Sequence, residues 1–329
     1  MSKLPLTISV SPYDHFADIL NGRVKPEGID LNILDLTLHD IFYRLIHFKD
    51  FDVGEMSMAK YVSMRSQGDD SLIALPVFPS RVARHSSIYI RRDGPVRKPA
   101  DLVGRRVGVP EWAQTAAVYS RGLLQHEFGV DLASIEWHQA GVHQAGRVEN
   151  VELRLPGGLE LKRHPDKSLA GMLVSGELDA VLSATPLNPY LSGHPNVARM
   201  FEDHVPVEME YMRRTGVIPI MHTVVVRKQV LDAHPWVAGN LFAAFTEARD
   251  RSVERMLDGG MTHAPILWCS EHAKLTQEIF GGDSYPYGVD GNRRTLEPFL
   301  QWAYEQGVCH RLLKAEDIFP AQTLRHYKV

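Results

Sequence analysis

Short apolar segments alternate with helical segments over most of the first 184 residues, and this alternation constrains the fold more than any other feature. The predicted strands cover residues 4–10, 28–34, 51–57, 105–109 and 178–184, and the predicted helices cover residues 14–21, 38–48, 116–128 and 169–175. Strands separated by helices are typical of βαβ units in a largely parallel sheet. The sequence therefore predicts an α/β protein.

Two of these units have the same plan. Residues 51–57 and 178–184 both run from an apolar residue and an aspartate through a short strand to a serine. We interpret this as weak internal symmetry between two lobes, although a chance likeness of two αβ units would look the same. Residues 85–91 and 221–227 are predicted to be strands that cross between the lobes. The first lobe is then residues 1–92 and 222–329, with a mainly helical C-terminal part, and the inserted second lobe is residues 93–221. A ligand is expected in the cleft between them.

Composition limits the function. The chain has 329 residues, which suits about two domains. Its 36 Lys and Arg against 40 Asp and Glu give a net charge of −4, unlike a nucleic-acid-binding protein. We find no apolar run near the ~20 residues of a membrane span and no apolar leader at the N-terminus. Cys269 and Cys309 are too few for a disulfide framework. We expect a cytoplasmic protein that binds neither nucleic acid nor membrane.

Several motifs resemble those of known families. Residues 101–109, DLVGRRVGV, are similar to the segment that opens the second lobe of type II periplasmic-binding proteins. The full set more closely resembles the 4,5-dihydroxyphthalate decarboxylase family, an enzyme branch on that fold, and covers nearly the whole chain. The matching segments are GEMS (54–57), PVFPSR (76–81) with RH (84–85), WAQTAA (112–117), RRTG (213–216), IPIMHT (218–223) and YGV (287–289) with NR (292–293). His15 departs from the family pattern, because a basic residue of the arginine type was expected there.

The resemblance implies a two-lobed, type II periplasmic-binding-protein-like fold whose cleft takes a small aromatic dicarboxylate. It implies loss of CO2 from 4,5-dihydroxyphthalate to give 3,4-dihydroxybenzoate. Such a site needs cations for two carboxylates and a general acid for the ring carbon that loses its carboxylate. The phenol para to that carboxylate supplies the electron push, so no cofactor is expected. Assistance by a divalent metal and assembly into a homo-oligomer are left open.

Candidate anion-binding residues lie on two segments. Arg81 and Arg84 follow an apolar strand, and a guanidinium binds carboxylate in a bidentate fashion. A solvated basic loop is the alternative. Gln114 and Thr115 lead into a helix, whose free N–H groups attract anions, although they are also ordinary capping residues. Glu111 would oppose an anion there unless it is protonated or faces a phenol.

Candidate proton-transfer residues lie at strand ends. His222 begins the returning strand and is the preferred acid, and His85 on the other crossing strand is the second candidate. Glu55, Ser57 and Asp14 are placed where cleft residues belong, and a carboxylate there could accept phenolic hydrogen bonds. The alternative for a strand histidine is an ordinary core residue, and the alternative for Asp14 is a helix cap.

A second cluster of polar residues carries less information. His138, His143, Gln144 and Arg147 are predicted to lie in a loop of the second lobe, as a cleft lip or as plain surface. Their spacing is poor for a metal site. Two other functions stay open on the same fold: a solute-binding protein that delivers an organic anion to a transporter, and a cytoplasmic biosynthetic enzyme that acts on another anion.

Overall fold

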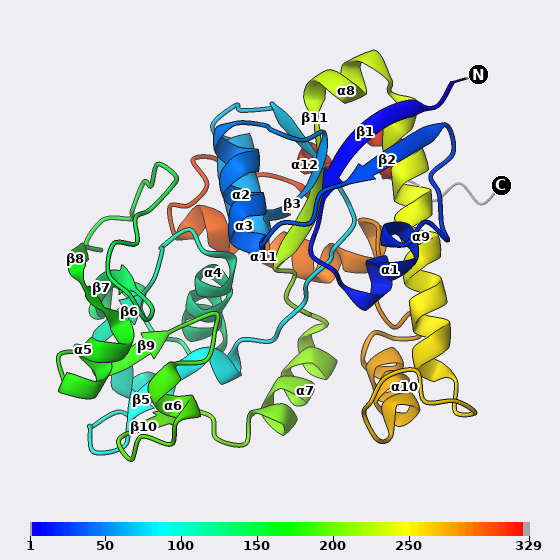
Figure 1. The fold of residues 1–329 in the computed structure, drawn as a ribbon. Coiled ribbons are helices and arrows are strands. Elements are labelled where there is room, and N and C mark those ends of the chain that lie inside the picture. The colour runs from blue at the N-terminus through cyan, green and yellow to red at the C-terminus, as the bar shows by residue number, and fades with distance from the viewer. Residues whose placement is uncertain (1, 325–329) are drawn as a thin grey trace.

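The computed structural model of the chain describes residues 2–324 and contains two sheets side by side (Figure 1). The first sheet has the strand order β2-β1-β3-β11-β4. Its strands are β1 (Leu4–Ser9), β2 (Ile29–Ile33), β3 (Val53–Ser57), β4 (Leu72–Leu75) and β11 (His222–Arg227). Strands β1, β2 and β3 run parallel, whereas β11 is antiparallel to both β3 and β4.

The second sheet has the strand order β10-β5-β9-β6-β7-β8. Its strands are β5 (Ile88–Arg91), β6 (Arg106–Val109), β7 (Glu136–Gly141), β8 (Leu161–Ser168), β9 (Ala180–Leu182) and β10 (Val197–Arg199). Strand β6 pairs in parallel with β7 and β9, and β5 is antiparallel to its two neighbours. Each sheet is therefore a parallel core with one inserted antiparallel strand, which agrees with the expected common plan of two lobes.

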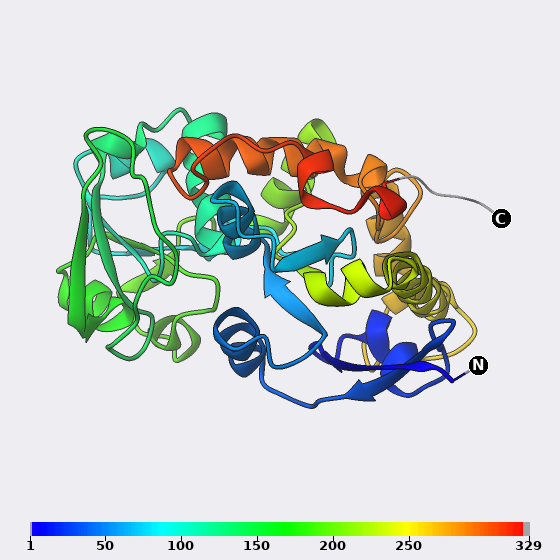
Figure 2. The same ribbon diagram turned by 90° about the horizontal axis from the view of Figure 1, so that it is seen from above.

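Helices pack around both sheets, and the view from above shows the two sheets toward opposite sides of the molecule (Figure 2). They are α1 (Ala17–Leu20), α2 (Leu38–His47), α3 (Met58–Ser66), α4 (Thr115–Gly122), α5 (Leu169–Ser175), α6 (Asn188–Leu191), α7 (His204–Thr215), α8 (Lys228–Ala233), α9 (Trp236–Leu257), α10 (Cys269–Ile279), α11 (Arg293–Glu305) and α12 (Ala315–Ile318). None of the helices within residues 2–324 is long and apolar enough to cross a bilayer.

The first crossing between the sheets differs from the sequence prediction. Residues 85–91 were expected to form one strand that crosses between the lobes, but His85–Ser87 is a 3₁₀ turn and β5 lies within the second sheet, where it pairs with β9 and β10. The crossing thus precedes Ile88. The second crossing agrees with the prediction, because β11 begins at His222 and inserts between β3 and β4. The domain boundaries themselves stay predictions.

The C-terminal helices do not belong to the first lobe alone. Helix α11 packs on α4 of the second lobe, where the rings of Phe299 and Tyr119 stack at 4.9 Å. Trp302 lies so close to Gly122 that an added Cβ would be 2.3 Å from its ring. The indole Nε1 of Trp112 also donates to the Gln306 carbonyl, at 2.7 Å. These contacts join the two lobes through one continuous apolar cluster.

Three other segments differ locally from the prediction. The helix expected over 116–128 ends as an α-helix at Gly122 and continues as a π-helical turn, Leu123–Glu127. In the C-terminal part, which was expected to be mainly helical, α8 and α9 are separated at Pro235, whose missing N–H cannot continue a helix. His138 was expected in a loop but lies on β7. The prediction was wrong because β7 is buried between β6 and β8 and its polar residues do not alternate with apolar ones.

Candidate active site

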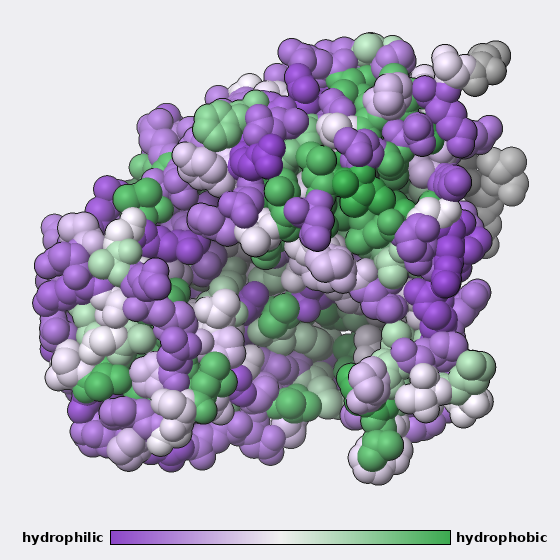
Figure 3. All heavy atoms as spheres, in the orientation of Figure 1, coloured by the Kyte–Doolittle hydropathy of each residue, from purple (hydrophilic) through white to green (hydrophobic). Residues whose placement is uncertain are grey.

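A cavity of about 490 Å³ lies between the two sheets, at the carboxyl end of β3. The space-filling view shows the molecule hollowed between its two halves (Figure 3). The lining residues come from both lobes and from the crossing segments between them: Leu38, His39, Phe42, Ser57, Lys60, Ser80, Val82, Arg84, Glu111, Gln114, Thr115, Ala116, Arg147, Ala184, Thr185, Met221 and His222. This is the expected position for a ligand in an open α/β sheet.

His222 and Glu55 form a hydrogen-bonded pair at the wall of this cavity. Strand register places His222 opposite Ser57, so Glu55, two residues earlier on β3, has its side chain on the same face. His222 Nδ1 lies 2.6 Å from Glu55 Oε1. Because Nδ1 is engaged, Nε2 is the ring nitrogen left to face a ligand. The Phe42 ring meets the imidazole edge-on at 5.0 Å and fixes its plane.

Glu55 is fully buried and well supplied with donors. The Tyr13 hydroxyl donates to Oε1 at 2.7 Å, and the Ser11 N–H donates to Oε2 at 2.9 Å. Burial by itself would raise the pKa of Glu55, but the hydrogen bonds from His222, Tyr13 and Ser11 outweigh it, and the pKa lies below its usual value. Glu55 is therefore a carboxylate at neutral pH. A carboxylate on Nδ1 orients the imidazole and stabilises a positive charge on it.

A chain of hydroxyl groups links the lobes beside this pair. The Thr115 hydroxyl accepts the Ala59 N–H at 3.0 Å and lies 2.9 Å from Ser57 Oγ. Thr115 is the first residue of α4, and Ser57 immediately precedes α3. If Thr115 gives its one hydroxyl proton to Ser57, the Ser57 proton is free for a ligand in the cavity.

Arg84 is a buried cation in the cavity wall, only 4 % exposed. Its guanidinium donates to Met221 Sδ at 2.6 Å and to the Ala184 carbonyl at 3.2 Å. Within residues 2–324, no carboxylate lies within ion-pair distance of it. Burial lowers its pKa to about 10, which still leaves it protonated at neutral pH. A buried charge of this kind is costly unless a counter-ion binds, so the wall is suited to a carboxylate.

Glu111 is a buried carboxylate, only 1 % exposed, and unlike Arg84 it is paired with side chains of opposite charge. Lys60 Nζ lies 2.9 Å from Glu111 Oε2, and Arg147 Nε lies 2.5 Å from Oε1. Lys60 comes from α3 of the first lobe, and Arg147 comes from the loop between β7 and β8. Glu111 is thus neutralised by two cations, which removes the expected conflict between this carboxylate and an anionic ligand.

The structure brings most of the sequence-predicted site residues together. Those that line the cavity or support a lining residue are His222, Glu55, Ser57, Arg84, Glu111, Gln114 and Thr115. Sequence reasoning did not select Lys60, His39, Phe42 or Tyr13, and it placed Arg147 only on a cleft lip. The position of Lys60, three residues after Ser57 at the start of a helix, was the available signal for it.

Three predicted residues lie away from the cavity lining. The Arg81 guanidinium donates through its two terminal nitrogens to the carbonyls of Ile218 (3.2 Å) and Pro286 (2.9 Å) and to Asn292 Oδ1, which turns it away from the cavity. Asp14 accepts from Ser252 at 2.5 Å, on α9.

The third is His85, which packs edge-on against aromatic rings of Phe201, Tyr211 and Phe128. Burial lowers its pKa, which favours the neutral ring of a core histidine. We therefore leave Arg81, Asp14 and His85 out of the proposed site.

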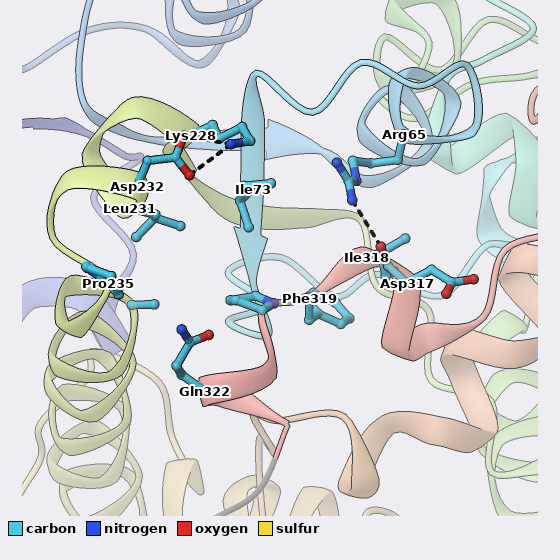
Figure 4. Close-up of a pocket in the computed structure, with 12 residues that line it drawn as sticks. Arg65, Ile73, Lys228, Leu231, Asp232, Pro235, Asp317, Ile318, Phe319 and Gln322 are labelled. Atoms are coloured by element: carbon cyan, nitrogen blue, oxygen red, sulfur yellow. Dashed lines mark hydrogen bonds and ion pairs between the residues drawn. The ribbon is translucent and has the colours of Figure 1, made fainter.

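A second cavity, of about 430 Å³, lies at the edge of the first sheet beside β4. Figure 4 shows two of its polar interactions as dashed lines. Lys228 Nζ is 2.6 Å from Asp232, one helical turn away, and Arg65 donates to the Asp317 carbonyl at 3.2 Å. This cavity has the size of a ligand site, but its ion pair is exposed to solvent, unlike the buried Arg84 of the cavity between the lobes.

No group of three or more His, Cys, Asp or Glu side chains in the described part of the chain could hold a metal ion. The two cysteines are free.

The chain is similar to two curated bacterial enzymes, and no protein-family model matches it. It is 34 % identical over 330 residues to 4,5-dihydroxyphthalate decarboxylase of Comamonas testosteroni, with both chains covered completely. It is 37 % identical over 204 residues to the enzyme of the same name from Pseudomonas putida, covering 62 % of this chain and 79 % of that one.

Solved structures are similar in fold. The periplasmic aliphatic sulphonate-binding protein SsuA of Escherichia coli has a TM-score of 0.55 at 11 % identity, with 98 % of this chain and 99 % of that chain covered. The desulfurization enzyme DSZB has a TM-score of 0.51 at 16 % identity, with 98 % of each chain covered. The expected two-lobed periplasmic-binding-protein-like fold is confirmed, and that fold supports both binding and catalysis.

Proposed function

Because the chain belongs to the 4,5-dihydroxyphthalate decarboxylase family, we propose that it converts 4,5-dihydroxyphthalate into 3,4-dihydroxybenzoate and CO2 in the cavity between its lobes. The observation that carries the proposal is the position of the His222–Glu55 pair in one wall with Arg84, a buried cation without a carboxylate partner, in the adjoining wall. The His222–Glu55 pair supplies a proton donor, and Arg84 supplies a counter-ion for an anionic substrate.

Binding begins with charge pairing. One substrate carboxylate replaces the weak thioether and carbonyl partners of Arg84, and its charge is also attracted by the N-terminus of α4. Gln114, beside that helix end, and the Ser57 hydroxyl proton provide neutral hydrogen bonds. Closure of the site against water strengthens each of these contacts.

The chemical step is protonation of the ring carbon that carries the departing carboxylate. The imidazolium Nε2–H of His222 donates the proton, while the para phenol pushes electrons toward that carbon. The C–C bond to the carboxylate then breaks, its electron pair returns to the ring, and aromaticity is restored as CO2 leaves. His222 is left neutral and takes a proton from solvent. Glu55 stabilises the imidazolium at the start of the cycle, so it is a positioning residue.

The test is turnover by purified protein treated with EDTA, with both CO2 and the ring product measured. We expect one CO2 and one 3,4-dihydroxybenzoate per substrate consumed. Tight binding of 4,5-dihydroxyphthalate without turnover would instead favour a binding protein for an organic anion. Activity that is lost with EDTA and restored by divalent ions would show that a metal assists. A cytoplasmic location stays part of the proposal, and cell fractionation tests it.

A further inference from the structure

Arg147 stands at the rim of the cavity with its charge held by Glu111. We propose that Arg147 exchanges Glu111 for the second carboxylate of the substrate and is the residue that selects dicarboxylates over monocarboxylates. This inference rests on the proposed function and adds a binding group for the carboxylate that Arg84 does not hold.

The charge balance around Glu111 permits this exchange. Two cations contact Glu111, and burial together with the charge of Glu111 raises the pKa of the neighbouring Glu149, which favours its neutral form. The Lys60 side chain is only 10 % exposed, whereas that of Arg147 is 38 % exposed. When Arg147 departs, Lys60 still neutralises the buried Glu111. The exchange therefore leaves no uncompensated buried charge, which would be the main cost of breaking such a pair.

The loop that carries Arg147 is held at three points, one of which is the Gly146 N–H, which donates to the Pro165 carbonyl at 2.9 Å. Gly141 ends β7 and lies against the backbone of Gln144, where an added Cβ would be 1.8 Å from the Gln144 carbonyl oxygen. Glu149 accepts the Ala113 N–H at 3.1 Å, which anchors the loop beside Glu111. Next to Arg147, Val148 is 65 % exposed. The backbone thus keeps Arg147 near the cavity, while its side chain lies in an exposed part of the loop.

The location of Arg147 also matches a second carboxylate. It lines both the main cavity and an adjoining recess of about 260 Å³ under α2, so it lies at the boundary between them. Arg84 follows β4 and contacts Met221 and Ala184, whereas Arg147 comes from the β7–β8 loop. The two guanidinium groups approach the cavity from different segments, and a phthalate presents two adjacent carboxylates. A benzoate, with its single carboxylate, can pair with only one of the two guanidinium groups.

The experiment compares binding of two ligands by calorimetry in protein carrying His222→Gln, in which turnover is expected to be strongly slowed. Adding Arg147→Gln is expected to weaken 4,5-dihydroxyphthalate binding by about 30-fold or more and 3,4-dihydroxybenzoate binding by less than about threefold. The matched control is Arg163→Gln, an exposed arginine on β8 of the same lobe, which should change neither affinity. A structural role for Arg147 would weaken both ligands alike.

Glu111→Gln supplies the reciprocal test. It removes the competing carboxylate, so we expect 4,5-dihydroxyphthalate to bind more tightly relative to 3,4-dihydroxybenzoate, and Arg147→Gln to cancel that gain. Equal losses for both ligands in Arg147→Gln, or no loss for the dicarboxylate, overturn the inference while turnover by the unmodified protein still supports the proposed function. If the unmodified protein neither binds nor converts 4,5-dihydroxyphthalate, both proposals fail together.

Discussion

The two large cavities of this protein have similar volumes and very different chemistry. The cavity beside β4 measures about 430 Å³ and the cavity between the lobes about 490 Å³. At β4, Lys228 is paired with a carboxylate on its own helix, and such exposed pairs contribute little. Between the lobes, Arg84 is buried without a carboxylate and Glu55 is buried under His222. Buried charge, rather than volume, distinguishes the site.

The largest expected effect is on chemistry at His222. His222→Gln should lower turnover of 4,5-dihydroxyphthalate by about 10²- to 10⁴-fold, the usual contribution of a general acid, with binding retained. Steady-state kinetics and calorimetry on the same preparation check this. His263→Gln, in the loop after α9, is the control and should keep full activity. Full turnover by His222→Gln would remove His222 from the mechanism.

The next effect separates two arginines that are three residues apart. Arg84→Gln should weaken substrate binding by about 2–5 kcal/mol, because a bound carboxylate would lose its buried partner. Arg81→Gln should instead lower the unfolding temperature, because the Arg81 guanidinium holds Ile218, Pro286 and Asn292 together. Dissociation constants and thermal melts distinguish the two variants. The reverse result would move the carboxylate site to Arg81.

Acid should destabilise the cleft side of the first sheet. His15 stacks on Tyr13, the donor to Glu55, and burial lowers its pKa from 6.5 to about 4. The unfolded chain therefore binds a proton on His15 before the folded protein does. His15 therefore does not lower the free energy of unfolding above pH 6.5, and lowers it progressively as the pH falls toward 4. The total loss is about 3 kcal/mol, at ~1.4 kcal/mol per pH unit.

His15→Phe should flatten this part of the pH–stability curve, measured by urea unfolding at several pH values. The low pKa of Glu55 acts in the same direction and continues the loss below pH 4.5. A His15→Phe curve that still falls as steeply between pH 6.5 and 4 would assign the loss to other groups.

The smallest effect is expected at the β4 cavity. Asp232→Asn breaks only the exposed pair with Lys228, so it should change the free energy of unfolding by less than about 0.5 kcal/mol and leave turnover unchanged. Denaturant unfolding and steady-state kinetics measure both. A tenfold loss of activity in this variant would show that the two cavities are coupled.

The sequence alone determined the two-lobed α/β architecture and part of the site. Strand and helix periodicity is a local property, so it could be predicted from stretches of a few residues. Local patterns also identified Glu55, Ser57 and Thr115 as candidates, because ligands of parallel sheets bind where strands end and helices begin.

Tertiary structure alone decided which charges are free. Arg81 and Arg84 are equivalent in sequence, but Arg81 pairs by backbone with Ile220 and turns toward Asn292, whereas Arg84 turns into the cavity. Lys60 and Arg147 meet at Glu111 from segments far apart in the chain. The state of a charged group depends on its partners and its burial, and both arise from contacts between distant residues that no local pattern encodes.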